Sequence, residues 1–210
     1  MKSVFSSWCR RFLLVCVGGM LVVGKTACAQ PEERGPAARP QPGIDVQDYD
    51  FRLALSDSTD RIEGQATVRL NVTTDTLSAI RLDLVGPPAA PSDPGMSVSA
   101  VLADGDSVAY RHSGDVLRIS PESRAAGRTH TFDIHYAGIP ADGLIIGTNR
   151  HDDRTFFGDN WPNRARHWLP VVDHLADKAT VEFRVRAPAQ YEVVSNGERV
   201  QDSTSGEVRH

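Results

Sequence analysis

The sequence predicts an all-β fold, a large twisted antiparallel β-sandwich or saddle, and three observations carry the prediction. Apolar and polar residues alternate with a period of two in most segments after Asp45, which is typical of half-buried strands. Glycine, proline and Asp/Asn–Gly turns separate these segments at intervals of roughly 8 to 15 residues. No window of about 12 residues beyond the N-terminal segment shows helical periodicity. Together these features favour an antiparallel all-β architecture over a parallel α/β sheet.

Residues 1–29 have the pattern of a secretory signal peptide. Three basic residues, Lys2, Arg10 and Arg11, precede an apolar run from Phe12 to Val23. That run is shorter than the about 20 residues that span a bilayer. Ala27-Cys28-Ala29 then matches the small-residue pattern that signal peptidase cuts. We therefore expect an exported protein, periplasmic or extracellular, whose mature chain begins near Gln30.

The alternative is a lipoprotein with an acylated Cys28. Lys25 stands where that motif expects an apolar residue. Membrane anchoring through Cys28 stays open as a second hypothesis, and no membrane span is predicted.

Cleavage after residue 29 changes the composition of the mature protein. All three cysteines (Cys9, Cys16 and Cys28) lie in the removed segment, so no disulfide is expected. The segment also carries four of the 23 basic residues, which leaves 19 against 27 acidic residues, a net charge of −8. An acidic chain without a basic cluster argues against nucleic acid as a partner.

The mature chain divides into a linker and one domain. Residues 30–44 are rich in proline, glycine and charge and are predicted to be a disordered tether. Residues 45–210 are predicted to form the β domain.

Strands are predicted wherever the alternation persists between turn residues. In order, the predicted strands cover residues 49–55, 62–72, 80–84, 98–102, 108–110, 117–119, 129–136, 181–185 and 191–194. Asp104-Gly105 is predicted to join the fourth and fifth as a hairpin, and Asn196-Gly197 to end the last as a turn. A returning strand starts only at Arg209-His210, so we expect the C-terminal end of the domain to be truncated.

No local motif supplies a complete catalytic apparatus. The seven histidines of the sequence include no H-E-x-x-H pair, and no G-x-S-x-G surrounds a serine. Asp152 and Asp153 lie in a polar segment that is typical of a solvated turn. We therefore expect neither catalytic residues nor metal ligands in this chain.

The segment from Asp159 to Thr180, DNWPNRARHWLPVVDHLADKAT, interrupts the alternating pattern. Its prolines fix the backbone, and its arginines and aspartates can form bidentate pairs. Tryptophan rings are seldom left fully exposed. One interpretation is an ordered loop held by an Arg–Asp network and two buried indoles. The alternative interpretation is a binding loop.

Several spaced elements point to a known family. These are DVQDYDFRLAL, IEGQATVRL, IRLDLVG, FDIHYAGIPADGL and WPNRARHWLPVVDHLADKATVEFRVRAPAQYEVVSNG. Residues 45–200 closely resemble the N-terminal β-saddle domain of the aminopeptidase N and leukotriene hydrolase family of zinc metallopeptidases. Residues 161–197 are the most specific part, because A-R, P-x-x-D, K-A-T and S-N-G follow in the family's order.

The resemblance implies a function that the residues alone do not. In that family, the saddle packs on a thermolysin-like catalytic domain that holds zinc through H-E-x-x-H and binds the substrate amine through G-x-M-E-N. Neither motif occurs in this chain. The implied function is the N-terminal domain of an exported zinc aminopeptidase, inactive without its catalytic partner. The alternative is a free-standing β-sandwich that binds peptides at the cell surface.

The resemblance also implies site residues. The family's loop before A-R lines the first substrate pocket, near the N-terminus of the peptide, and its counterpart here is Asp159–Trp161. Asp159 is expected to bind the substrate amine and Trp161 to wall the side-chain pocket, with Asn160 between them. Trp161 departs from the family's usual polar residue, and Leu175 from its usual proline. The residues expected to be structural are Arg166, Trp168, Pro170 and Asp173.

Overall fold

The computed structural model describes residues 41–75, 77–120 and 126–210, which belong to one compact unit, Pro36–His210. The predicted signal peptide and nearly all of the predicted linker lie outside the described residues. Within them, every regular element except one 3₁₀ turn is a β-strand. The predicted all-β fold is confirmed.

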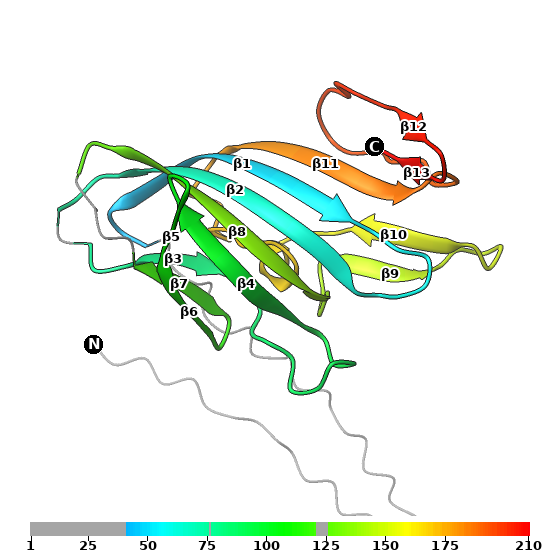
Figure 1. Ribbon diagram of the computed structural model, residues 1–210, viewed down its shortest axis with the longest axis horizontal. Coiled ribbons are helices and arrows are strands. Elements are labelled where there is room, and N and C mark those ends of the chain that lie inside the picture. The colour runs from blue at the N-terminus through cyan, green and yellow to red at the C-terminus, as the bar shows by residue number, and fades with distance from the viewer. Residues whose placement is uncertain (1–40, 76, 121–125) are drawn as a thin grey trace, which may run out of the picture. The chain divides into compact units, whose positions relative to one another are not determined.

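One large curved sheet forms the frame of this unit (Figure 1). Its strands, in spatial order, are β12 (Thr204–Ser205), β13 (Val208–Arg209), β11 (Thr180–Pro188), β1 (Ile44–Ala54), β2 (Ile62–Val72), β8 (Thr129–Ile139), β4 (Gly95–Ala103) and β5 (Asp106–Ser107). All neighbours are antiparallel except β1 and β11, which run parallel. The sheet is therefore mixed, a detail that alternation along a single strand does not reveal.

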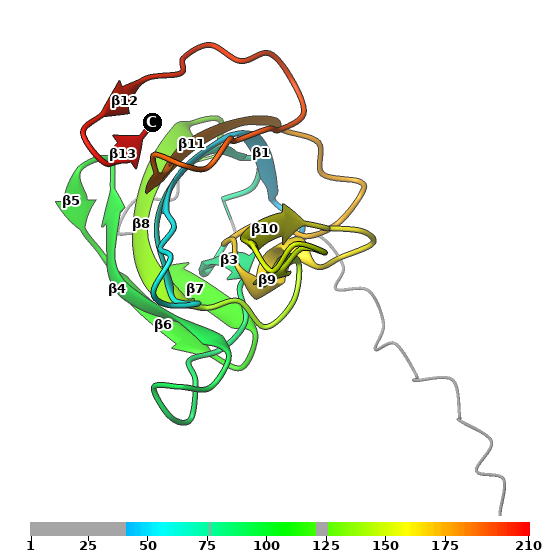
Figure 2. The same ribbon diagram turned by 90° about the vertical axis from the view of Figure 1, so that its right-hand side faces the viewer.

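Two small sheets lie on the concave side of the large one (Figure 2). The first contains β3 (Ile80–Asp83), β7 (Val116–Ser120) and β6 (Ala109–Ser113). The second is a hairpin of β9 (Leu144–Thr148) and β10 (Arg154–Gly158). The 3₁₀ turn η1 (Ala165–His167) follows this hairpin.

The core fills the space between the large sheet and the three-stranded sheet. Alternate residues of β1, β2 and β8 point inward, as their sequence pattern predicts. The largest fully buried side chains are Phe51, Phe132, Ile62, Leu70, Ile80, Leu82, Leu84, Met96, Leu117, Ile119, Ile134 and Val46. These side chains come from both layers, so the two sheets bury one continuous apolar core.

The predicted hairpin around Asp104-Gly105 is right in its turn and wrong in its second strand. β4 returns after this turn as the two-residue β5. Tyr110 instead lies in β6, which pairs with β7 in the other sheet. The chain passes from the large sheet to the three-stranded sheet beside Val108. The segment that was predicted to be the second strand of a hairpin therefore contributes to two different sheets.

The predicted strand at residues 191–194 is wrong. These residues adopt no regular structure, and Val194 is 84% exposed. Tyr191 packs edge-on against Phe156, with 5.5 Å between ring centroids. An alternating segment forms a strand only where a neighbouring strand supplies backbone hydrogen-bond partners. Among the described residues, no strand pairs with this segment. The sequence interpretation also missed β9 and β10, which are short strands with apolar residues on both faces.

Candidate functional site

Backbone hydrogen bonds hold the segment between β10 and β11 against both small sheets. The Asp159 N–H donates to the Gly143 carbonyl at 2.7 Å, and the Val85 N–H donates to the Arg166 carbonyl at 2.7 Å. Val171 exchanges hydrogen bonds with Asp83 at the end of β3. Gly143 has a φ of 76°, and a Cβ there would collide with the backbone of this segment. The segment is thus an ordered part of the fold.

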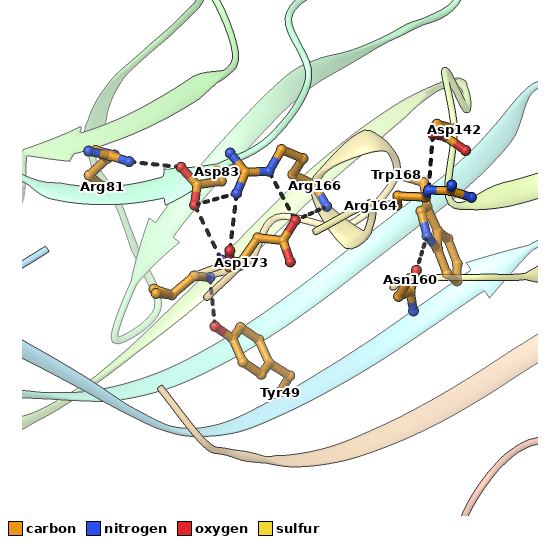
Figure 3. Close-up of polar contacts among 10 residues, drawn as sticks. Tyr49, Arg81, Asp83, Asp142, Asn160, Arg164, Arg166, Trp168 and Asp173 are labelled. Carbon is orange, nitrogen blue, oxygen red and sulfur yellow. Dashed lines mark hydrogen bonds and ion pairs between the residues drawn. The ribbon is translucent and has the colours of Figure 1, made fainter. Parts of the chain in front are cut away.

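A buried ionic network fixes the centre of the segment (Figure 3). The Arg166 Nε donates to the Asp173 carboxylate at 2.9 Å, and its Nη2 donates to the Asp173 carbonyl at 3.1 Å. The same Nη2 lies 3.7 Å from Asp83 Oδ2, and Arg81 pairs with Asp83 Oδ1 at 3.0 Å. The side chains of Arg166, Asp173 and Asp83 are only 15%, 10% and 7% exposed. Asp83 is the last residue of β3 and precedes Arg166 by 83 positions in the sequence. It therefore connects β3 with the network.

Tyr49 adds a contact from the large sheet. Its hydroxyl oxygen accepts the Val172 N–H at 2.9 Å (Figure 3). Burial raises the pKa of the Tyr49 phenol above its usual value, against the lowering effect of that hydrogen bond. The phenol therefore stays neutral at physiological pH and serves as a fixed polar anchor.

Trp168 anchors the start of the segment. Its ring is 5% exposed and stacks on Phe183 of β11, with 6.3 Å between ring centroids. The indole Nε1 donates to the Asn160 side-chain oxygen at 2.9 Å (Figure 3). Pro170 is buried two residues further on. This arrangement ties the position of Asn160, and with it the turn at residues 159–161, to the core.

Asp159 is half exposed and already paired. Arg164 Nη1 donates to its carboxylate at 3.1 Å, while Arg164 Nε lies 3.5 Å from Asp142. The Trp161 N–H also donates to Asp159, at 3.3 Å. The carboxylate is thus oriented by two neighbours, and part of its surface remains open to a ligand.

Trp161 differs from the interpretation that both indoles are buried, because its side chain is 67% exposed. It lines a groove of about 670 Å³ together with apolar neighbours, among them Pro162, Leu175 and Val181. Asp173, His174, Asp177 and Lys178 supply the polar part of the same wall. The structure therefore brings the predicted residues Asn160 and Trp161 into one concave surface, and Asp159 directly precedes them.

Asp177 gives this groove a pH-dependent property. Burial raises the pKa of its carboxyl above the usual 3.8, more than the Val46 backbone hydrogen bond lowers it. A raised folded-state pKa contributes stability that is complete below pH 3.8 and is lost as pH rises through the folded value.

We expect the free energy of unfolding of the Asp177→Asn variant at pH 7 to be higher than that of wild type. In wild type, the ionisation of Asp177 makes this free energy lower at pH 7 than at pH 4, and the variant should lack this contribution. Asparagine keeps an acceptor for the Val46 N–H without the negative charge, which is only partly buried. Urea melts of both proteins at the two pH values measure the difference. An identical decline in both proteins contradicts the prediction.

Several contributors to this site were not among the predicted residues, and Asp83 and Tyr49 are two of them. Asp83 carried no signal of its burial, because it takes a polar place in the alternating segment from Ile80 to Leu84, as Arg81 does. Tyr49 carried none, since its alternation in β1 marks it only as a core residue. The chemistry of the region is that of a rigid support with an exposed indole, an oriented carboxylate and a groove.

The profile of the peptidase M1 N-terminal domain matches residues 46–209. The chain belongs to the peptidase M1 family. The match takes in the large sheet from Val46 of β1 to Arg209 of β13 and the segment with the ionic network, so the resemblance predicted from the sequence is confirmed. No curated protein matches the sequence significantly.

Solved M1 structures share the fold of this M1 domain. An M1 zinc metallopeptidase from Deinococcus radiodurans, solved as a mutant with a Tyr-Ser-Ala substrate, is 26% identical with a TM-score of 0.67; the match covers 81% of this chain and 38% of that chain. A two-domain M1 zinc metallopeptidase bound to L-tryptophan is 26% identical, with a TM-score of 0.66 and coverages of 81% and 39%. Yeast LTA4 hydrolase shares the fold at 19% identity, with a TM-score of 0.64 and coverages of 80% and 26%. This M1 chain therefore spans well under half the length of these relatives.

The zinc of the M1 zinc metallopeptidases has no matching ligand set in the part of this M1 chain that the structure describes. Among residues 41–75, 77–120 and 126–210, no three His, Cys, Asp or Glu side chains gather in a way that could hold a metal ion. We therefore assign no zinc-dependent step to the described residues. The same residues contain no helix long and apolar enough to cross a bilayer.

Proposed function

We propose that residues 45–210 are the N-terminal β domain of an exported zinc-dependent aminopeptidase, which removes N-terminal residues from peptides. Residues 1–29 are its signal peptide, and residues 30–44 are its linker. The family match over residues 46–209 carries this proposal. The role of the domain is to supply the rim of a substrate pocket whose zinc-bearing side belongs to a thermolysin-like catalytic domain.

The geometry of residues 159–161 supports a rim with divided roles. The Asp159 carboxylate is held in place by Arg164, which orients it and offsets part of its charge. In this proposal it accepts a hydrogen bond from the ammonium group of the substrate. The exposed Trp161 ring offers the largest apolar area and walls the pocket for the first side chain. Asn160 is committed to Trp168 and positions the turn.

The chain alone is expected to lack peptidase activity. We expect the purified 210-residue protein to leave aminoacyl-anilides uncleaved and to bind zinc no more tightly than an unrelated acidic protein does, because the described residues offer no ligand set. Equilibrium dialysis against zinc and an anilide assay with and without a chelator are the measurements. Zinc-dependent turnover by this chain would overturn the expectation.

The decisive test of the proposed function is the genomic DNA that follows the codon for His210. A continuation, in frame or frameshifted, that encodes H-E-x-x-H and G-x-M-E-N supports the aminopeptidase. A stop codon followed by an unrelated gene would instead favour the free-standing peptide-binding module.

A further inference from the structure

Three arginines lie in one row across the three-stranded sheet, whose strands are side by side in Figure 1. Arg118 of β7 is the Cα partner of Arg81 in β3 and of Arg111 in β6. Leu117 and Ile119 are fully buried, so Arg118 and its two cross-strand neighbours point away from the core. We call Arg81, Arg111 and Arg118 the arginine row. The sequence does not reveal it, because the three residues come from three separate strands.

The large sheet also places two arginines opposite each other, and there it neutralises them. Arg52 of β1 is the Cα partner of Arg184 in β11. The Asp50 carboxylate lies 3.7 Å from the Arg52 Nη2 and 3.3 Å from the Arg184 Nη2. Glu182 lies 2.8 Å from the Arg184 Nε. Like charges directly opposite each other destabilise a sheet, and these carboxylates offset that cost.

The arginine row lacks such compensation at two of its three positions. Asp83 pairs with Arg81 at 3.0 Å. Among the described residues, no carboxylate lies within ion-pair distance of Arg111 or Arg118, although both side chains are ordered on exposed strands. Asp115, in the turn between β6 and β7, accepts a backbone N–H at 3.1 Å instead. Arg111 and Arg118 therefore present two neighbouring positive charges to solvent.

Two neighbouring guanidinium groups fit one tetrahedral oxyanion. Directly opposite residues of an antiparallel pair have Cβ atoms about 4.5–5.5 Å apart, so the long side chains of Arg111 and Arg118 can reach the same anion. Each guanidinium can donate two parallel hydrogen bonds to phosphate oxygens. Ser113 and Ser120 are exposed two positions beyond these arginines, so their hydroxyls lie on the same face of the sheet and can donate to a remaining oxygen.

The charge of the whole protein favours a small anion over a large polyanion. The 210-residue chain has a net charge of −4. A nucleic acid or an anionic membrane would bring many negative charges close to the acidic residues outside the row. A single phosphate group meets only the row, because charges further away than about 8 Å are largely screened at physiological ionic strength.

We propose that Arg111 and Arg118, supported by Arg81, bind the phosphate group of a small soluble compound. Arg111 and Arg118 donate hydrogen bonds to the phosphate oxygens. Arg81, held by Asp83, adds positive potential from β3. The bound anion takes the place that Asp50 has between the opposite arginines of the large sheet. Phosphate binding therefore stabilises the fold, because it removes the repulsion within the row.

The first test is a titration of the full 210-residue chain with inorganic phosphate at constant pH and ionic strength, followed by backbone-amide NMR. We expect saturable shifts at residues 109–120 with a dissociation constant on the order of 1 mM. Arg111→Gln and Arg118→Gln should each raise this constant about fivefold. Arg61→Gln is the matched control, since Arg61 is exposed, precedes β2 and has no arginine opposite it.

Thermal melts separate lost binding from a folding defect. Without phosphate, Arg118→Gln should melt about 1–3 °C above wild type, because it removes the charge between two other arginines. Phosphate should raise the Tm of wild type and of Arg61→Gln and should have a smaller effect on Arg118→Gln. A variant that is more stable but responds less to phosphate has lost a ligand and not its fold.

Three results would overturn the proposal. One is a shift at residues 109–120 that does not saturate with phosphate. Another is an equal dissociation constant for wild type and both row variants. The third is binding to vesicles that contain phosphatidylglycerol, or to an oligonucleotide, without saturable phosphate binding, because the row would then recognise a polyanion.

Discussion

Replacing Arg166 by alanine is expected to lower the free energy of unfolding by about 3–5 kcal/mol. The substitution removes the guanidinium from between two carboxylates, Asp173 and Asp83, that are almost fully buried. The negative charges of both carboxylates would then be less well neutralised, because Arg81 pairs with Asp83 and not with Asp173. Breaking a buried pair by removing one partner costs this much because an uncompensated charge remains in the interior. Urea unfolding followed by circular dichroism measures the loss.

A surface pair in the same chain provides the control. Arg199 lies 3.3 Å from Asp202, but its side chain is 63% exposed. Arg199→Ala should change stability by about 1 kcal/mol or less, as exposed ion pairs do. If the two variants lost equal stability, the network around Arg166 would not support the segment in the way we describe.

Replacing Trp168 by alanine is the second substitution with a large expected effect, a loss of about 3–5 kcal/mol. The buried ring stacks on Phe183, and its removal leaves a cavity between β11 and the segment from Asp159 to Ala179. The substitution also frees Asn160 from its hydrogen bond with the indole. We therefore expect faster hydrogen exchange at residues 159–161 in addition to the lower melting temperature.

Trp168→Phe separates the two contributions. Phenylalanine keeps an aromatic ring against Phe183 but has no N–H, so Asn160 loses its donor. We expect a smaller stability loss than for alanine, with the exchange at residues 159–161 still faster than in wild type. Exchange that is unchanged in both variants would show that Trp168 does not position the rim.

These two predictions connect stability with the proposed function. Trp161 is exposed and Asp159 is half exposed, and the backbone that carries both is held in place by buried neighbours. Arg166, Trp168 and Asp173 hold the backbone on which the rim is presented. A loss of this support would displace the rim even though no rim residue is changed.

The sequence predicted the core of the large sheet well, because the burial of a strand is a local property. In β2, the alternation from Ile62 to Val72 places every second side chain inward, and the structure buries Ile62, Ala66, Val68, Leu70 and Val72. The same logic failed for Tyr191 to Val194, where the pattern is present and no strand lies beside it. A periodic pattern shows which face would be buried, but it does not supply the neighbour.

The family motif from Trp161 to Gly197 was likewise readable along the chain, since its spacing is a property of the sequence. It gave the family and drew attention to residues 159–161. It assigned Trp161 to a pocket wall and Trp168 to the support, but only the structure gives their surroundings: Trp168 is buried against Phe183, and Trp161 is exposed over the groove.

By itself, then, the sequence determined the all-β class, the inward residues of the long strands and the family. Only the tertiary structure decided that β1 and β11 run parallel, that Asp83 meets Arg166, and that Trp161 and Leu175 share one exposed face. The physical reason is that alternation and motif spacing arise between residues close in sequence. Pairing direction, buried ion pairs and exposure depend on which distant segments come to lie against each other.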